Sequence, residues 1–414
     1  MKIRIKYLLL LYPLLIICIP RPSMLDDIYI HMLDVLLILY PLFVIILLFF
    51  TDKSFQLRIN SRNLNILILL LIYLSWQLIV IGYWTLDTKT SANDIFQLYK
   101  PLYYICALLI GIVSVRYISM KDLIRLLIAI QIINIIVSVF QFLEIEQSFY
   151  IFCNRPKEAI IIEYIREKTI ARVIGTIGNP SMFGLLEAVL TIFFFHLFNE
   201  KKKILYLFLS ATALFLMIQT QSRTAFMLFF IMVFFYIFLY SKIKLSFKTI
   251  TLFSLLAAIF YITIFELQTI PYLSDGIKTV LQEGLLKQNS FYARLEIWND
   301  LFDLIKKNYM FGYGPALEYL NFSFADNNYI LIVFRFGIIG LLIFISIIVL
   351  YLFYLYESVL SVRVLVSLFW ILLLFSGFFM DSLESMKITP LLFLFSSFTI
   401  QKQDEVQNNS GKIK

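Results

Sequence analysis

Long apolar runs alternate with short polar connections along most of the chain. A helix of about 20 apolar residues spans a bilayer core of roughly 30 Å. Read at that length, the chain contains twelve candidate transmembrane helices: 7–20, 28–50, 64–84, 95–115, 123–143, 173–198, 204–220, 224–240, 249–267, 329–356, 364–380 and 387–400. The first and last runs are short, which fits tilted or interfacial segments as well. The pattern predicts an all-α polytopic membrane protein in which residues 1–400 form a single integral membrane domain.

Composition supports this prediction. Hydrophobic residues make up 61% of the chain and charged residues 15%, against about 45–50% and about 25% in soluble proteins. The net charge is +8. If the amino terminus is cytoplasmic, Lys and Arg gather in the connections on the inner side, as the positive-inside rule requires. We therefore expect both termini in the cytoplasm and no nucleic-acid partner.

Two outer connections, 144–172 and 268–328, are much longer than the rest. Long ordered connections usually carry function, so we expect the activity on the outer face. Within the larger loop, helical spacing places four apolar residues on one side of an amphipathic helix: Trp298, Leu301, Phe302 and Ile305. The polar segment 401–414 is expected to be a mobile cytoplasmic tail.

Three arginines lie where the membrane topology disfavours them. Arg294 projects from the apolar side of the amphipathic helix, where it either swings into water or meets an anionic group. Arg223 lies in the short outer connection between two spans and is either an interfacial anchor or a ligand-binding residue. Arg172 opens a stretch rich in Gly and Pro before the sixth run, which is either a cavity lip or a packing interface of small residues.

Two further charged residues lie deep in apolar runs, where each costs at least about 2.5–3.5 kcal/mol on insertion scales. Glu187 either makes an interhelical hydrogen bond or belongs to a site. Asp326 lies at the outer end of the tenth run. Arg335 lies about nine residues deeper in that run and needs a partner or a solvated cavity.

Four motifs follow one another on the expected outer side: R-x-x-G-x-x-G-N-P from Arg172 to Pro180, which includes Asn179; S-R at 222–223; R-x-x-x-W at 294–298 with a G-x-G turn at Gly312 and Gly314; and D-N-x-Y at 326–329 followed by G-x-x-G at 337–340. In this order they resemble the bacterial O-antigen and capsule polymerase (Wzy-type) and O-antigen ligase superfamily. The resemblance covers about residues 172–340.

The resemblance implies a glycosyltransferase-C-like fold in the bacterial plasma membrane and a role in cell-envelope and capsule polysaccharide biosynthesis. Such enzymes move a glycan from undecaprenyl diphosphate, a membrane lipid that carries it, to a sugar hydroxyl. It also brings a chain-length regulator and a flippase into consideration as partners. Carried over by motif position, the resemblance implies that Arg172, Arg223 and Arg294 bind the diphosphate and the glycan. We expect catalytic roles for Asp326, Arg223 and Arg294, and substrate-binding roles for six residues: Arg172, Asn179, Arg335, Glu187, Gly312 and Gly314.

The chemistry agrees with these roles, because permanently charged guanidinium groups suit a diphosphate leaving group and a carboxylate suits a general base. No D-x-D sequence and no His/Cys cluster occurs, so we expect no metal and no cofactor. The ligase branch usually has a histidine where Asp326 stands, whereas this chain has only His31 and His196. Polymerase is the leading hypothesis; a ligase, a flippase or other transporter, and a structural membrane protein remain open.

Overall fold

The computed structural model describes residues 2–19, 32–52, 55–86, 98–152, 172–240, 289–315, 327–358 and 362–411, apart from 381, 384 and 386. All regular structure in these ranges is helical. The helices are α1 (Lys2–Cys18), α2 (Met32–Thr51), α3 (Ser61–Leu86), α5 (Tyr99–Ser114), α6 (Met120–Phe142), α7 (Glu146–Phe152), α9 (Pro180–Lys201), α10 (Ile204–Gln219), α11 (Arg223–Tyr240), α14 (Asn289–Lys307), α15 (Asn328–Tyr356), α16 (Val362–Ser376) and α17 (Ile388–Gly411).

Every apolar run expected from the sequence has a helix at its place except the ninth, 249–267, which lies outside the described residues. By length and composition, four of the described helices can cross a membrane: Ser61–Trp84, Met120–Phe142, Pro180–Lys201 and Asn328–Tyr356. The remaining apolar helices are shorter. The architecture is that of a helical polytopic membrane protein, while twelve crossings remain a prediction.

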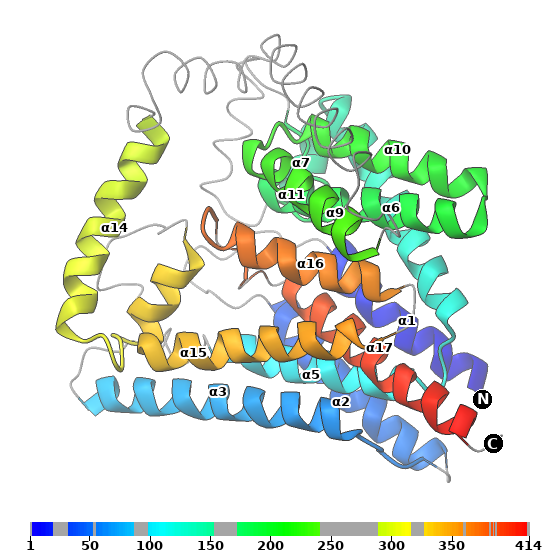
Figure 1. Cartoon of the computed structure of the whole chain (residues 1–414), viewed down its shortest axis with the longest axis horizontal. Coiled ribbons are helices and arrows are strands. Elements are labelled where there is room, and N and C mark those ends of the chain that lie inside the picture. Colours follow the sequence, from blue (N-terminus) through cyan, green and yellow to red (C-terminus); the bar gives the residue numbers. More distant parts are fainter. Residues whose placement is uncertain are drawn as a thin grey trace.

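Most helices are roughly aligned, and both chain termini lie at one end of the bundle (Figure 1). We call this the termini end. Helix α14, yellow in Figure 1, lies across the opposite end, which we call the α14 end. Helix α17 contacts α1, α3, α5, α15 and α16 and so forms the centre of the bundle. Its contact with α5 is close, because a Cβ atom on Gly111 would collide with the Leu394 carbonyl oxygen.

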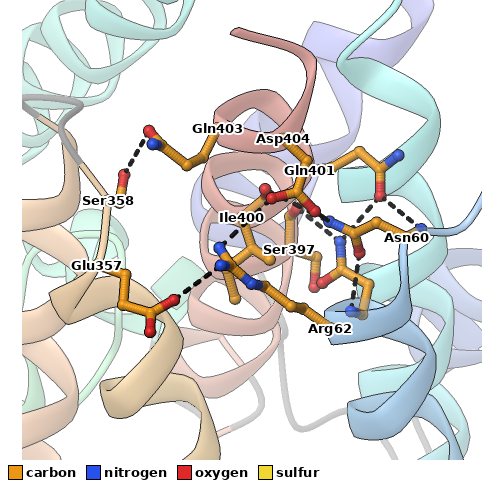
Figure 2. A network of polar contacts seen from close by, with 10 residues as sticks. Asn60, Arg62, Glu357, Ser358, Ser397, Ile400, Gln401, Gln403 and Asp404 are labelled. Atoms are coloured by element: carbon orange, nitrogen blue, oxygen red, sulfur yellow. Dashed lines mark hydrogen bonds and ion pairs between the residues drawn. The ribbon is translucent and has the colours of Figure 1, made fainter. Parts of the chain in front are cut away.

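At the termini end, polar side chains join three helices (Figure 2). Arg62 of α3 bridges Glu357 after α15 and Asp404 of α17, with N–O distances of 2.7 and 3.3 Å. Asn63 Nδ2 donates to Gln401 Oε1 over 3.2 Å. Residues 401–411, expected from the sequence to be a mobile tail, instead continue α17 as helix, and the first of them are held by these contacts.

Helix α9 begins later than the apolar run that predicted it. The run starts at 173, but residues 172–179 are irregular and the helix starts at Pro180. Gly175 and Gly178 have φ of 54° and 86°, values that glycine adopts readily and other residues rarely. Asn179 then caps the helix, since its Oδ1 accepts hydrogen bonds from two backbone N–H groups of the first turn. We call residues 172–179 the lip.

Helix α15 is broken at Gly337, whose φ of 68° and ψ of −179° are not helical. A break at membrane depth leaves backbone groups without water to bind. The turn after α14 supplies their partners. The Tyr313 and Gly314 N–H groups donate to the Phe334 and Arg335 carbonyl oxygens, each over 2.8 Å.

Two further bonds complete the repair of the break. The Ile338 N–H donates to the Tyr309 carbonyl oxygen over 2.8 Å, and Trp76 Nε1 of α3 donates to the Phe336 carbonyl oxygen over 2.8 Å. The turn approaches so closely that a Cβ atom on Gly337 would collide with the Met310 carbonyl. The turn residues 309–314 and the broken helix therefore form one hydrogen-bonded unit.

We predict that Gly337→Ala destabilises the protein. The positive φ alone costs a residue with a side chain about 1–3 kcal/mol, and the collision with Met310 adds to it. The detergent-solubilised variant should melt at lower temperature and give less monodisperse protein on size-exclusion chromatography.

Gly82→Ala in α3 is the matched control, because a Cβ atom there meets nothing within 4 Å. Equal melting temperatures for the two variants would show that the break does not depend on glycine.

Candidate functional site

The lip and the turn before α11 meet at one place. Arg172 Nε donates to the Thr220 carbonyl oxygen over 3.0 Å, and the Val173 N–H donates to the Gln219 carbonyl oxygen over 3.2 Å. Helix α11 then begins at Arg223. Two of the arginines singled out in the sequence therefore lie on segments that are joined to each other.

Two side chains of α6 bind the lip by hydrogen bonds. Gln141 Oε1 accepts hydrogen bonds from the Ile174 and Gly175 N–H groups, over 3.0 and 2.8 Å. Its Nε2 donates back to the Gly175 carbonyl oxygen over 3.2 Å. At the next residue of the lip, Thr176 Oγ1 donates to Asn134 Oδ1 over 2.7 Å. A buried irregular backbone is stable only when its polar groups are paired, and α6 provides these pairs.

Glu187 belongs to the same network. Its carboxylate is fully buried and accepts from Gln131 Nε2 over 2.8 Å and from Asn134 Nδ2 over 2.9 Å. This is the interhelical hydrogen bond that the sequence left open as one interpretation. Glu187 thus orients Asn134, which in turn holds Thr176 of the lip.

Lys387 is a functional candidate that the sequence analysis missed. Its side chain is 2% exposed, its Nζ donates to the Thr176 carbonyl oxygen of the lip, and it lies 5.8 Å from the centre of the Phe152 ring. A buried ammonium group is costly unless it is paired. The available signal was its position as the first residue of the last apolar run, at the expected outer end, where the positive-inside rule disfavours lysine.

Arg335 lies beside a small cavity, as its depth in the sequence required. Its side chain is buried, and the cavity is lined by residues of α3, α5 and α15: Tyr73, Gln77, Lys100, Pro101, Tyr104, Arg335, Phe336 and Phe344. The cavity has a volume of about 10 Å³, which suits about one water molecule or one oxygen of a larger group.

Two polar residues of this cavity were not found from the sequence. Lys100 of α5 brings a second cation to the cavity wall. Gln77 is 3% exposed, and its Oε1 has no hydrogen-bond donor among the described residues. A buried amide oxygen of this kind calls for a donor such as water or a hydroxyl group. Both residues lie in the outer halves of their apolar runs. The sequence pattern does not show that these two runs meet at Arg335.

Helix α14 is the predicted amphipathic helix, and it begins at Asn289. Its Leu301 packs against Ile330 and Phe334 of α15. Arg294 is half-buried and precedes Leu301 by two helical turns, so it lies on the side that faces the bundle. Phe302, expected on the same side, is exposed because it lies at the rim of that face.

Gly312 and Gly314, predicted to bind substrate, lie against the broken helix. Their φ values are 71° and 72°, and a Cβ atom on Gly312 would lie 2.6 Å from the Arg335 carbonyl carbon. The Gly312 carbonyl oxygen accepts from Trp84 Nε1 over 2.9 Å and from Asn308 Nδ2 over 2.6 Å. The close approach to α15 and the positive φ values explain why glycine stands at both positions. Asn179 likewise uses its side-chain oxygen as a helix cap.

Asp326 lies outside the described residues. The residues after it are well held: Asn327 caps α15 by accepting from the Tyr329 and Ile330 N–H groups. Asn328 Oδ1 accepts from the Leu383 N–H over 2.8 Å. The start of α15 is therefore tied to the connection between α16 and α17, and that connection leads to Lys387 and the lip.

His196 lies at the far end of α9 from the lip. Its Nε2 is 3.3 Å from Glu200 Oε1, and its Nδ1 is 3.2 Å from the Tyr236 hydroxyl. In the described part of the chain, no three His, Cys, Asp or Glu side chains come close enough together to hold a metal ion.

Residues 205–345 match a family model described as O-antigen ligase. The match runs from α10 into α15 and so includes Arg223, Arg294, the glycine turn and Arg335, while Arg172 and the lip precede it. No curated protein matches the chain. Members of this family are membrane glycosyltransferase-like enzymes that act on lipid-linked oligosaccharides. Through residues 205–345, about a third of its length, the chain is similar to this family, which is consistent with a member of the O-antigen ligase and polymerase superfamily.

Proposed function

We propose that this protein is a polysaccharide polymerase that joins undecaprenyl-diphosphate-linked repeat units on the outer face of the bacterial plasma membrane. The observation that carries the proposal is the bond from Arg172 to the Thr220 carbonyl oxygen. It joins the lip, which precedes the family match, to the turn that leads to Arg223 inside the match.

The proposed chemistry is a single displacement. The oxygen of an acceptor sugar hydroxyl bonds to the anomeric carbon of the donor glycan, while the bond from that carbon to the diphosphate breaks. The electron pair leaves with the diphosphate, and the hydroxyl proton passes to Asp326 as general base. The anomeric centre inverts in such a step.

Arg172, Arg223 and Arg294 stabilise the leaving diphosphate in this proposal. Guanidinium groups stay charged and can bind two phosphate oxygens at once. Preorganised charge of this kind is often the largest catalytic contribution where water is excluded. Arg335 and Lys100 add charge at the cavity between α3, α5 and α15. Glu187 and Asn179 hold the lip rather than the substrate.

The side of the membrane is also part of the proposal. Six of the described cations lie at the termini end, where they pair with acids or bind backbone carbonyl oxygens: Lys6, Arg62, Arg116, Arg125, Arg363 and Lys402. Positive connections face the cytoplasm. The α14 end then faces outward, where lipid-linked repeat units are joined.

A ligase is the second candidate, and the description of the matched family favours it. A ligase would transfer the glycan to a different acceptor. In this chain, no histidine occupies the position of Asp326, and His196 lies at the other end of its helix from the lip. These two observations favour the polymerase.

Purified protein in liposomes with undecaprenyl diphosphate-linked repeat units tests the function directly. A ladder of longer lipid-linked glycans identifies a polymerase. Transfer only to an added second acceptor identifies a ligase, and the absence of any new glycosidic bond rejects both.

We predict that Arg223→Ala and Arg294→Ala each lower the rate of chain extension at least about a hundredfold, the usual loss when one preorganised donor is removed from a developing anion. The ladder assay measures this loss. Arg58→Ala is the control, because this exposed arginine lies at the termini end and its removal should leave the rate unchanged. Wild-type ladders from either site variant would remove that arginine from the mechanism.

Asp326→Asn should lower kcat far more than it changes KM for the lipid-linked donor. The amide keeps the size and polarity of the side chain but cannot take the hydroxyl proton. Initial rates over a range of donor concentrations separate the two constants. An unchanged kcat would mean that another group, or the substrate itself, accepts the proton.

A further inference from the structure

A lipid-facing groove runs along the seam between α3 and α15. It has a volume of about 420 Å³, and its walls are apolar except for one serine: they include Ile68, Ile72, Ser75, Trp76, Ile339 and Ile343. Ile72, in the middle of the α3 wall, is 46% exposed. The groove is therefore a furrow in the outer surface of the bundle rather than part of its core.

The Trp76 side chain lies in this seam. A Cβ atom on Gly340 of α15 would lie 3.4 Å from Trp76 Nε1 of α3, so the Trp76 ring packs against the α15 backbone at this level. Trp76 is also fixed by its bond to the Phe336 carbonyl oxygen and by stacking on Phe311, with ring centres 5.4 Å apart. The furrow is thus preformed and leads toward the α14 end.

The mouth of the groove carries interfacial residues. Tyr309, Met310 and Phe311 follow α14 and are exposed, Tyr309 at 58%. Exposed aromatic side chains of this kind collect at the level of lipid headgroups. Directly before them, Lys306 and Lys307 end α14 and are exposed as well. The mouth therefore offers positive charge to an anionic headgroup while the groove offers apolar walls to its tail.

The other side of the same seam faces the cavity that Arg335 and Lys100 line. Gln77 and Arg335 line the polar cavity there, and each is next in the chain to a residue that borders the seam, Trp76 and Phe336. A lipid lying in the groove would thus carry its headgroup to the level of Arg335 and Lys100, the two cations that the proposal places at this cavity.

We propose that the α3–α15 groove binds the isoprenoid tail of the polyisoprenyl diphosphate donor. This inference rests on the proposed function. The groove is a single seam between two helices, which suits one branched chain better than the two acyl chains of a phospholipid. Its β-branched isoleucine walls leave gaps between methyl groups into which the methyl branches of an isoprenoid can pack.

Photo-crosslinking tests the proposal. Full-length protein in phosphatidylcholine nanodiscs is given undecaprenyl diphosphate with a diazirine in its isoprenoid chain, and labelled peptides are identified by mass spectrometry. We expect the label on α3 and α15, competed by unlabelled undecaprenyl diphosphate and not by phosphatidylglycerol. Label mainly on other helices, or equal competition by phosphatidylglycerol, would overturn the proposal.

Groove-filling variants provide the second measurement. Ile72→Trp and Ile343→Trp should reduce labelling roughly tenfold and raise KM for the donor, with kcat unchanged. Ile136→Trp on α6 is the matched control, since Ile136 is 50% exposed and lies outside the groove; its labelling should equal that of the wild type. If either groove variant melts at lower temperature than the control, the smaller Ile→Phe change at that position replaces it.

The two proposals fail in different ways. A wild-type protein that is labelled in the groove but forms no glycosidic bond would reject the polymerase and keep the lipid site. A protein that extends chains while both groove variants keep wild-type labelling and KM would reject the groove alone.

Discussion

The hydrogen bonds between the turn 309–314 and the break in α15 are the interaction on which the α14 end depends. Inside a membrane, backbone groups that a helix does not pair must find partners in the protein. Here the Phe334, Arg335 and Phe336 carbonyl oxygens are all paired by the turn or by α3. The consequence is mechanical: α14 and Arg294 are attached to the same broken helix that carries Arg335.

The lip follows the same rule on the other side of the bundle. Its irregular backbone has no helix or strand to complete it, so Gln141 and Lys387 bind its amide and carbonyl groups. Each irregular segment has an arginine beside it: the lip begins at Arg172, and the break in α15 follows Arg335. A site that must present charge to a lipid-borne diphosphate needs rigid backbone there, and paired polar groups provide that rigidity.

Local sequence pattern predicted most of the helices and the character of several positions. The apolar runs located the described spans, helical spacing found the inward face of α14, and the depth of Arg335 implied the cavity that lies beside it. The glycine motifs were located, but their contacts could not be predicted. A glycine needed for contact with a ligand and one needed for contact with another helix look the same in a single sequence, and the packing of Gly312 and Gly314 on α15 appears only in the structure.

The sequence alone determined the helix content and the membrane class. It also identified the charged residues whose free-energy cost in an apolar run requires a reason. Each of these depends on the solvation of a residue and its near neighbours. The break at Gly337, the burial of Lys387 and the role of Gln141 were decided only by the tertiary structure. Their partners are distant in the chain, so the free energy that makes each favourable exists only once the helices have packed.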